Sequence, residues 1–288
     1  PYLIPFLIGL TILEDIGYLP RVAYLMDSFM HRIGLHGTAT LPAVLGYGCS
    51  VPAVMATRIL PSKRDKVIAA IVATLVPCSA RSVVIFGLVA RYLGAGAALF
   101  IYVLNIFVIA LTGKVLSMIM PEVSPGMIME IPRYQLPTLT ALFRKVWFRV
   151  REFIIIAWPL LILGSIILGM VEFWGWDLIL NKIFSPLSWL LGLPAKVGTT
   201  LIFGVLRKEL SLIMLMQALG TTEVLSVLTP VQVMTFTIFI TFYIPCMATI
   251  AVLIKELGNR WTVTIIGITL LLATILGLIS RLGFGLLL

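Results

Sequence analysis

The sequence predicts an all-α, polytopic membrane protein, and two observations support that prediction. Of the 288 residues, 60% are hydrophobic and 11% are charged, whereas about a quarter of the residues in a soluble domain are charged. Apolar runs of about 20 residues recur along the chain, and an α-helix needs that length to cross a hydrocarbon core of about 30 Å. We therefore expect most of the chain to lie inside lipid.

Six of these runs predict spanning helices, because each is bounded by charged residues, Pro or Gly. They are residues 1–20, 67–90, 97–120, 152–172, 231–254 and 262–283. Two further segments, 36–60 and 195–219, are apolar but interrupted, the first by Pro and Gly and the second by charged residues. Broken backbone at membrane depth survives only inside protein or along a polar cavity. We therefore expect two broken or re-entrant helices.

Basic residues predict the orientation of the spans. If both interrupted segments are re-entrant, the positive-inside rule places the main basic clusters together on the cytoplasmic side. These clusters are Arg21/Arg32, Lys63/Arg64/Lys66, Arg133 through Arg151, and Lys255/Arg260, while the opposite side holds Arg91, Lys182, Lys196 and Glu223. Residues 121–151 and 255–260 are then expected on the same side.

Short sequence matches indicate an internal repeat. Gly34, Leu35 and Gly46 recur as Gly192, Leu193 and Gly204, and Pro77-Cys78-x-Ala80 recurs as Pro245-Cys246-x-Ala248. Each half then holds three spans and one broken segment, and an odd number of spans inverts the second half in the membrane. We expect a first repeat at 1–120, a polar, basic, interfacial connection at 121–151, and a second repeat at 152–288.

All three cysteines follow a helix breaker. Gly48 precedes Cys49, Pro77 precedes Cys78, and Pro245 precedes Cys246. Soft sulfur beside backbone carbonyls that a broken helix frees is a site that favours divalent transition metals over Mg²⁺ or Ca²⁺. We therefore expect metal contact at these cysteines. The alternative is that each cysteine packs as a small hydrophobe.

Neighbouring polar residues extend this expected site. Ser50 and Ser79 directly follow two of the cysteines, and their hydroxyls are expected either to bind the metal or to hydrogen-bond the freed carbonyls. Arg81 lies well inside a predicted span, where a charge is costly, so it faces protein or water. An acid such as Glu209 is its expected partner.

The densest charge at predicted membrane depth is Arg207-Lys208-Glu209. Ionisable groups inside a membrane are functional candidates by default, so Glu209 joins the expected metal site. Arg207, Lys208 and Arg81 are expected to form a gating network, in which Arg207 and Glu209 hold the second broken segment closed. Glu14 and Asp15 follow an apolar run, where they either recruit cations at a mouth or form a solvated span end.

Motifs of other functional classes are not found. The chain has no nucleotide-binding G-x-x-x-x-G-K-[ST], no H-E-x-x-H and no G-x-S-x-G, so enzymatic chemistry is not expected. The net charge of +9 comes with no nucleic-acid motif, and nucleic acid is not an expected partner.

Several stretches resemble the ferrous iron transport protein B family. The longest runs from Gly46 to Arg58, Gly-Tyr-Gly-Cys-Ser-Val-Pro-Ala-Val-Met-Ala-Thr-Arg, and is similar to the family's signature. The others, in the family's order, are Leu13 through Arg21 with Met26-Asp27, Cys78-Ser79-Ala80-Arg81, Phe203 through Glu209, and Pro245-Cys246. The likeness spans nearly the whole chain.

This resemblance implies a multi-pass permease of the plasma membrane with two gate repeats, which carries Fe²⁺ inward. It places Cys49, Cys78 and Cys246 at the family's pore-cysteine positions. It also implies an N-terminal cytoplasmic GTP-binding domain that drives or regulates transport and a small cytoplasmic partner protein. GTP would bind only in that domain, and no permanently bound cofactor is expected.

The first apolar run begins at Pro1, and we interpret the chain as a piece of a longer protein that lacks this domain. A homo-oligomer is a further expectation. Two alternatives to iron stay open from the residues: gate-repeat transport of a nucleoside or another divalent metal, and an intramembrane thiol redox protein. The second would need paired thiols, and the chain has no C-x-x-C.

Overall fold

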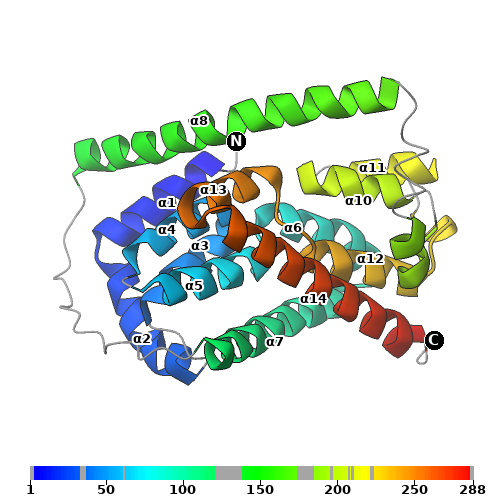
Figure 1. Cartoon of the computed structure of the whole chain (residues 1–288), viewed down its shortest axis with the longest axis horizontal. Helices are drawn as coiled ribbons and strands as arrows, with labels where there is room; N and C mark the ends of the chain where they lie inside the picture. The colour runs from blue at the N-terminus through cyan, green and yellow to red at the C-terminus, as the bar shows by residue number, and fades with distance from the viewer. Residues whose placement is uncertain are drawn as a thin grey trace. The chain divides into compact units, whose positions relative to one another are not determined.

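The computed structural model describes residues 3–32, 37–60, 62–120, 138–173, 185–194, 197–206, 208, 211–220 and 224–285. Within these ranges all regular structure is helical, which confirms the all-α class (Figure 1). The first half contains α1 (Leu3–Asp15), α2 (Tyr18–Arg32), α3 (Thr40–Gly48), α4 (Ser50–Ala56), α5 (Lys63–Leu75), α6 (Ser79–Val84) and α7 (Ala95–Ile119). The second half contains α8 (Leu139–Phe173), helical residues 185–191, α10 (Val197–Leu206), α11 (Ser211–Leu219), α12 (Pro230–Phe242), α13 (Met247–Leu257) and α14 (Asn259–Gly285).

Four helical stretches among the described residues are long and apolar enough to cross a membrane. They are Lys63–Ala90, Ala95–Ile119, Pro230–Leu257 and Asn259–Phe284, and they match four of the six expected spans. The expected span 1–20 is divided at Gly17, whose φ of 84° favours glycine, into α1 and α2. The expected span 152–172 lies inside the 35-residue helix α8. The structure therefore supports four spans and does not confirm the number six.

Two of the four stretches are interrupted and two are continuous. Lys63–Ala90 consists of α5, a gap, α6 and a π-helical turn, while Pro230–Leu257 consists of α12, a gap and α13. Their most apolar windows are 72% and 67% buried within the protein, against 28% for both α7 and α14. The interrupted helices therefore form the interior, and the continuous ones expose apolar side chains in the way that lipid-facing helices do.

Local sequence signals explain where the interrupted helices begin. The Ser62 hydroxyl accepts a hydrogen bond from the backbone N–H of Asp65 at 2.9 Å, which caps α5. Before α12, Thr229 and Gln232 form a reciprocal capping box, and Pro230 occupies the first turn, where no N–H is needed. In both cases, the cap fixes the residue at which the helix that contains the apolar run begins.

The chain divides into two compact units whose boundaries differ from the predicted repeats. Unit 1 comprises Pro1–Cys78, Ile106–Trp158 and Ala251–Trp261, and unit 2 comprises Ser79–Asn105, Pro159–Ile250 and Thr262–Leu288. Each unit therefore takes segments from both halves of the sequence. The order of elements nevertheless recurs: a pair of short helices, an interrupted long helix and a continuous long helix follow one another twice.

The connection at 121–151 is only partly described. Residues 121–137 lie outside the described residues, and residues 139–151 form the start of α8. The basic, aromatic run at 143–149, which belongs to the expected interfacial connection, is thus continuous with the helix that holds 152–172. Lys145 in this run forms an ion pair with Asp15 at the end of α1.

Candidate functional site

All three cysteines stand where a helix is interrupted, and each is a half-buried free thiol. Cys49 separates α3 from α4, and its extended backbone (φ −155°, ψ 131°) ends one helix and begins the next. These two helices, which we call the first helix pair, pack against each other and are about 14 and 10 Å long. Neither is long enough to span a membrane, as expected for the interrupted segment 36–60.

The first break, residues 76–78, interrupts the span that begins at Lys63. The N–H of Val76 still donates to the carbonyl of Val72 at 3.1 Å, but Pro77 has no N–H to offer the carbonyl of Ala73. The chain then leaves the helical path, and Cys78 precedes α6. The sequence signal for this break is therefore the proline itself.

The first helix pair lies directly against the last turn before this break. A Cβ added to Gly46 would be 3.0 Å from the Cβ of Val76 and 3.3 Å from the carbonyl oxygen of Ala73. Leu45 and Ala53 complete a small buried cluster with Ala73. The lack of a side chain at Gly46 thus permits the close approach.

The second break, residues 243–246, repeats this arrangement. Tyr243 donates its N–H to the carbonyl of Phe239 at 2.8 Å, and Pro245 then lacks the N–H that would reach the carbonyl of Thr241. Helix α13 resumes with the N–H of Ile250 on the carbonyl of Cys246 at 3.0 Å. The Cys246 thiol lies 3.1 Å from the Thr249 hydroxyl.

A second helix pair, α10 and α11, packs beside this break. A Cβ at Gly204 would be 2.8 Å from the hydroxyl oxygen of Ser211 and 3.4 Å from the Cδ1 atom of Ile240 in the last turn of α12. The sequence repeat matches Gly46 with Gly204, but Gly204 lies closest to Ser211 of α11 and meets the interrupted helix only at the Ile240 side chain. The repeat and its inversion in a membrane stay predictions.

Two buried cations bind the carbonyls at the second break. The ammonium of Lys208, which lies between α10 and α11, donates to the carbonyl oxygens of Ile240 at 3.3 Å and Tyr243 at 3.2 Å. The guanidinium of Arg81 in α6 donates to the same Tyr243 oxygen at 3.2 Å. Lys208 is 2% exposed and Arg81 is 1% exposed. Cations at the carbonyl end of a helix are stabilised by its dipole.

The structure describes some of the other expected site residues but not all of them. Ser50 is buried in the first turn of α4, and Ser79 is exposed at the start of α6. Arg207 and Glu209 lie outside the described residues, so the expected pair of Arg81 with Glu209 stays a prediction. Glu14 and Asp15 are half-buried at the end of α1. Within the part of the chain that the structure describes, no three His, Cys, Asp or Glu side chains form a metal-binding group.

Sequence reasoning identified the charged residues but missed Ile240 and Tyr243. Both residues bind the cations through their backbone carbonyls, and because every residue has a carbonyl, the residue type gives no signal. Pro245 gave only an indirect signal, because a proline ends the helix before it and leaves the last carbonyls of that helix without intrahelical partners.

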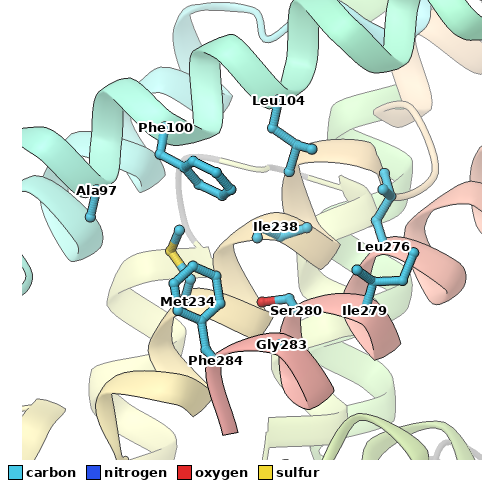
Figure 2. Close-up of a pocket in the computed structure, with 10 residues that line it drawn as sticks. All are labelled: Ala97, Phe100, Leu104, Met234, Ile238, Leu276, Ile279, Ser280, Gly283 and Phe284. Atoms are coloured by element: carbon cyan, nitrogen blue, oxygen red, sulfur yellow. The ribbon is translucent and has the colours of Figure 1, made fainter. Parts of the chain in front are cut away.

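Unit 2 also has an apolar cavity of about 410 Å³ between α7, α12 and α14. Figure 2 shows Phe100, Ile238 and Phe284 around it, with the hydroxyl of Ser280 as the polar group in the lining. That hydroxyl is 3.4 Å from the hydroxyl of Thr235. A metal ion needs several oxygen, nitrogen or sulfur ligands, so this cavity does not suit one.

Comparison with known families gives two matches. The Gate family, described as nucleoside recognition, matches residues 1–92 and 154–260. The family described as ferrous iron transport protein B C terminus matches residues 98–149. No solved structure matches the chain.

Several curated proteins are similar to the chain. The Fe(2+) transporter FeoB of Methanocaldococcus jannaschii is 28% identical over 97% of this chain and 46% of its own length. The protein of the same name from Synechocystis is 33% identical over 89% of this chain and 45% of its own length. An Fe(2+) transport protein A/Fe(2+) transporter FeoB fusion protein of Porphyromonas gingivalis is 33% identical over 57% of this chain and 20% of the fusion. The chain thus spans a little under half the length of the first two relatives.

Proposed function

Because the chain belongs to the ferrous iron transport protein B family, we propose that it forms the membrane pathway of a permease that carries Fe²⁺ into the cell. One observation carries the proposal: Cys49, Cys78 and Cys246 each stand at a helix interruption and are half-buried. If the cysteines served only to pack the interior, there would be no reason for all three to stand at a helix interruption. The proposed pathway is therefore lined by sulfur and by backbone carbonyls.

The chemistry of such a pathway suits Fe²⁺. The ion sheds part of its hydration shell inside a membrane, and thiol or thiolate sulfur with carbonyl oxygen replaces the lost ligands. Ser50, Ser79 and Glu209 are proposed as additional oxygen ligands. Mg²⁺ and Ca²⁺ prefer oxygen ligands and do not gain from sulfur, so a sulfur-lined pathway discriminates against them.

We propose the orientation of the chain in the membrane from the charges of unit 1. All basic clusters that we expected on the cytoplasmic side have residue numbers within unit 1. Two ion pairs within this unit, Arg58 with Glu256 and Lys145 with Asp15, connect segments that the re-entrant topology places on that side. We propose that these contacts mark the cytoplasmic end of a multi-pass protein of the plasma membrane.

The remaining partners are proposals from the family. An N-terminal GTP-binding domain and a small cytoplasmic protein are proposed regulators, and the fusion relative from Porphyromonas gingivalis favours the second. Glu14 and Asp15 are proposed to attract cations at the mouth, and Arg207 with Glu209 to hold the second helix pair closed. A homo-oligomer stays a proposal without structural support.

The relatives do not favour the alternatives. The similar proteins from Methanocaldococcus jannaschii and Synechocystis are named as Fe(2+) transporters, although the Gate family description mentions nucleosides. Transport of a nucleoside or of another divalent metal is therefore an outcome to be tested. The thiol redox alternative has no paired cysteines in the sequence to support it.

Anaerobic uptake into liposomes that contain the full chain tests the proposal. Fe²⁺, Mn²⁺, Zn²⁺ and a nucleoside are offered separately, with protein-free liposomes as the control. We expect Fe²⁺ uptake above the control and no nucleoside uptake. Nucleoside uptake without metal uptake would refute the proposal, and equal uptake of all three metals would refute its iron selectivity.

A further inference from the structure

The apolar cavity of unit 2 has a buried floor and an exposed rim. Met234 and Ile238 of α12 form the floor, and each is 1% exposed. On the rim, Phe100 of α7 is 46% exposed and Ile279 of α14 is 60% exposed. Figure 2 shows side chains from these three helices around one shared space. The cavity therefore lies between an interior helix and two helices whose apolar side chains are exposed.

The rim of the cavity faces lipid when the protein lies in a membrane. The most apolar windows of α7 and α14 are 28% buried, so most of their apolar surface is open to the surroundings. In a bilayer, the surroundings of such helices are hydrocarbon. The molecules that meet the rim are therefore acyl chains rather than water.

The lining and the size of the cavity suit hydrocarbon. Ser280 carries the one side-chain hydroxyl among the ten lining residues, and that hydroxyl lies 3.4 Å from the Thr235 hydroxyl. Apolar cavities stay dry and accept apolar ligands, and one of about 150 Å³ binds benzene, which has six carbon atoms. By that ratio, a volume of about 410 Å³ holds on the order of fifteen carbon atoms. This is about the size of one phospholipid acyl chain.

Residues typical of the headgroup region lie near the ends of α7 and α14 that border the cavity. Arg91 is exposed shortly before α7 begins, and its guanidinium lies 5.8 Å from the centre of the Tyr92 ring. Arg281, which follows the lining residue Ser280, donates to the carbonyl of Trp189 at 3.1 Å, and Trp189 is 78% exposed. Arg, Tyr and Trp anchor membrane proteins at the level of the lipid headgroups. A phospholipid with its headgroup at this level can direct an acyl chain into the cavity.

We propose that this cavity binds one acyl chain of a membrane phospholipid, which packs between α7 and α14 and against α12. The acyl chain supplies contacts that an empty cavity lacks, and it thereby stabilises unit 2. The lipid is held at one position, unlike the lipids that only surround the protein. The inference goes beyond the proposed function, because it requires the protein to lie in a membrane but not to carry iron.

Photochemical labelling tests the site. The full chain is reconstituted into phospholipid vesicles that include a phosphatidylglycerol with a diazirine in the middle of one acyl chain. After irradiation, mass spectrometry identifies the labelled peptides. We expect label on the α12 peptide that holds Met234 and Ile238, in addition to label on exposed side chains such as Leu271 of α14. Because the two α12 residues are each 1% exposed, lipids that only surround the protein do not reach them.

Two glycines of α14 provide a matched pair of variants. Both are exposed, and a Cβ at Gly283 or at Gly267 would have open space around it, but Gly283 lines the cavity and Gly267 does not. Gly283→Phe should fill the cavity and lower the α12 label about tenfold, whereas Gly267→Phe should leave it unchanged. Ala97→Phe fills the cavity from α7 and should act like Gly283→Phe, so the test stands if one of these variants does not fold.

Thermal unfolding provides a second readout. A ligand that binds the folded state raises the Tm. Phospholipid added to the protein in detergent should raise the Tm of the parent and of Gly267→Phe more than the Tm of Gly283→Phe. The inference would be overturned by absence of α12 label in the parent, by undiminished label in both cavity-filling variants, by an equal loss of label in Gly267→Phe, or by equal rises in Tm. None of these measurements uses iron, so failure of the lipid site and failure of the proposed function are distinguishable.

Discussion

Each of the two interrupted helices contains a proline followed by a cysteine, but, of the two breaks, it is the second whose helix end accepts the described hydrogen bonds from buried cations. At the first break, the described contact is the packing of Gly46 against Val76 and Ala73. At the second break, Gly204 packs mainly against Ser211 and also meets the Ile240 side chain, and two buried cations bind the helix end. The two breaks thus share a proline and a cysteine, while the groups that contact their helix ends differ. Equivalent cysteines need not have equivalent roles.

The largest expected effect comes from removing the ammonium at the second break. Lys208 makes two hydrogen bonds from a charged donor, each worth about 1.5 to 3 kcal/mol, and relief of charge burial offsets part of their loss. We expect Lys208→Met to lower the free energy of unfolding by about 2 kcal/mol, measured by denaturant titration in mild detergent.

The matched control lies in the first helix pair. The offset that relates Gly46 to Gly204 also relates Ser50 to Lys208, and Ser50 is neutral. Ser50→Ala should cost less than about 1 kcal/mol of unfolding free energy. If the two variants have the same free energy of unfolding, the Lys208 ammonium does not contribute to the stability of the fold.

A smaller effect is expected from the two glycines. Gly46→Ala places its Cβ against a backbone oxygen and a Cβ, which cannot move by themselves, whereas Gly204→Ala meets a serine hydroxyl that can rotate. Overpacking at Gly46 should cost about 1 to 2 kcal/mol, while the helix propensity of Ala should make Gly204→Ala nearly neutral. Thermal unfolding of both variants measures the difference. A greater loss at Gly204 would mean that the second helix pair is the more tightly packed of the two.

The smallest effect is expected where a cation is exposed. Arg58 pairs with Glu256, but its side chain is 47% exposed, so solvent screens the pair. We expect Arg58→Gln to change the unfolding free energy by less than about 1 kcal/mol in the same titration. A loss as large as that of Lys208→Met would show that charge removal anywhere is harmful, and that burial at the break is not the cause.

Hydropathy and proline placement predicted much of this structure. The helical class, four spans and the interruptions at Cys78 and Cys246 were predictable, because apolar length and a missing proline N–H act locally, and Gly48 marked the interruption at Cys49. The span expected at 1–20 was divided at Gly17, because a positive φ is a conformational choice that hydropathy does not register. The two compact units were also not predictable, since they depend on contacts between segments distant in sequence.

The charged residues of the candidate site were predictable, but the groups that they bind were less so. Arg81 and Lys208 were identified because a buried charge is costly, which makes it visible in a sequence. That both would bind the Tyr243 carbonyl was not predictable, because every residue has a carbonyl and only the fold brings one within reach. The metal ligands proposed from the cysteine positions stay a prediction.

Iron uptake by cysteine variants tests the central claim most directly. Cys→Ser roughly preserves size and hydrogen bonding but replaces soft sulfur with a hard hydroxyl, whereas Cys→Ala is tolerated where cysteine only packs. We would measure anaerobic Fe²⁺ uptake into liposomes for Cys49→Ser, Cys78→Ser and Cys246→Ser, each beside its Ala counterpart. The account predicts that each Ser variant stays folded and loses about tenfold or more of its uptake. If all six variants carry Fe²⁺ as fast as the parent, the sulfur-lined pathway is wrong.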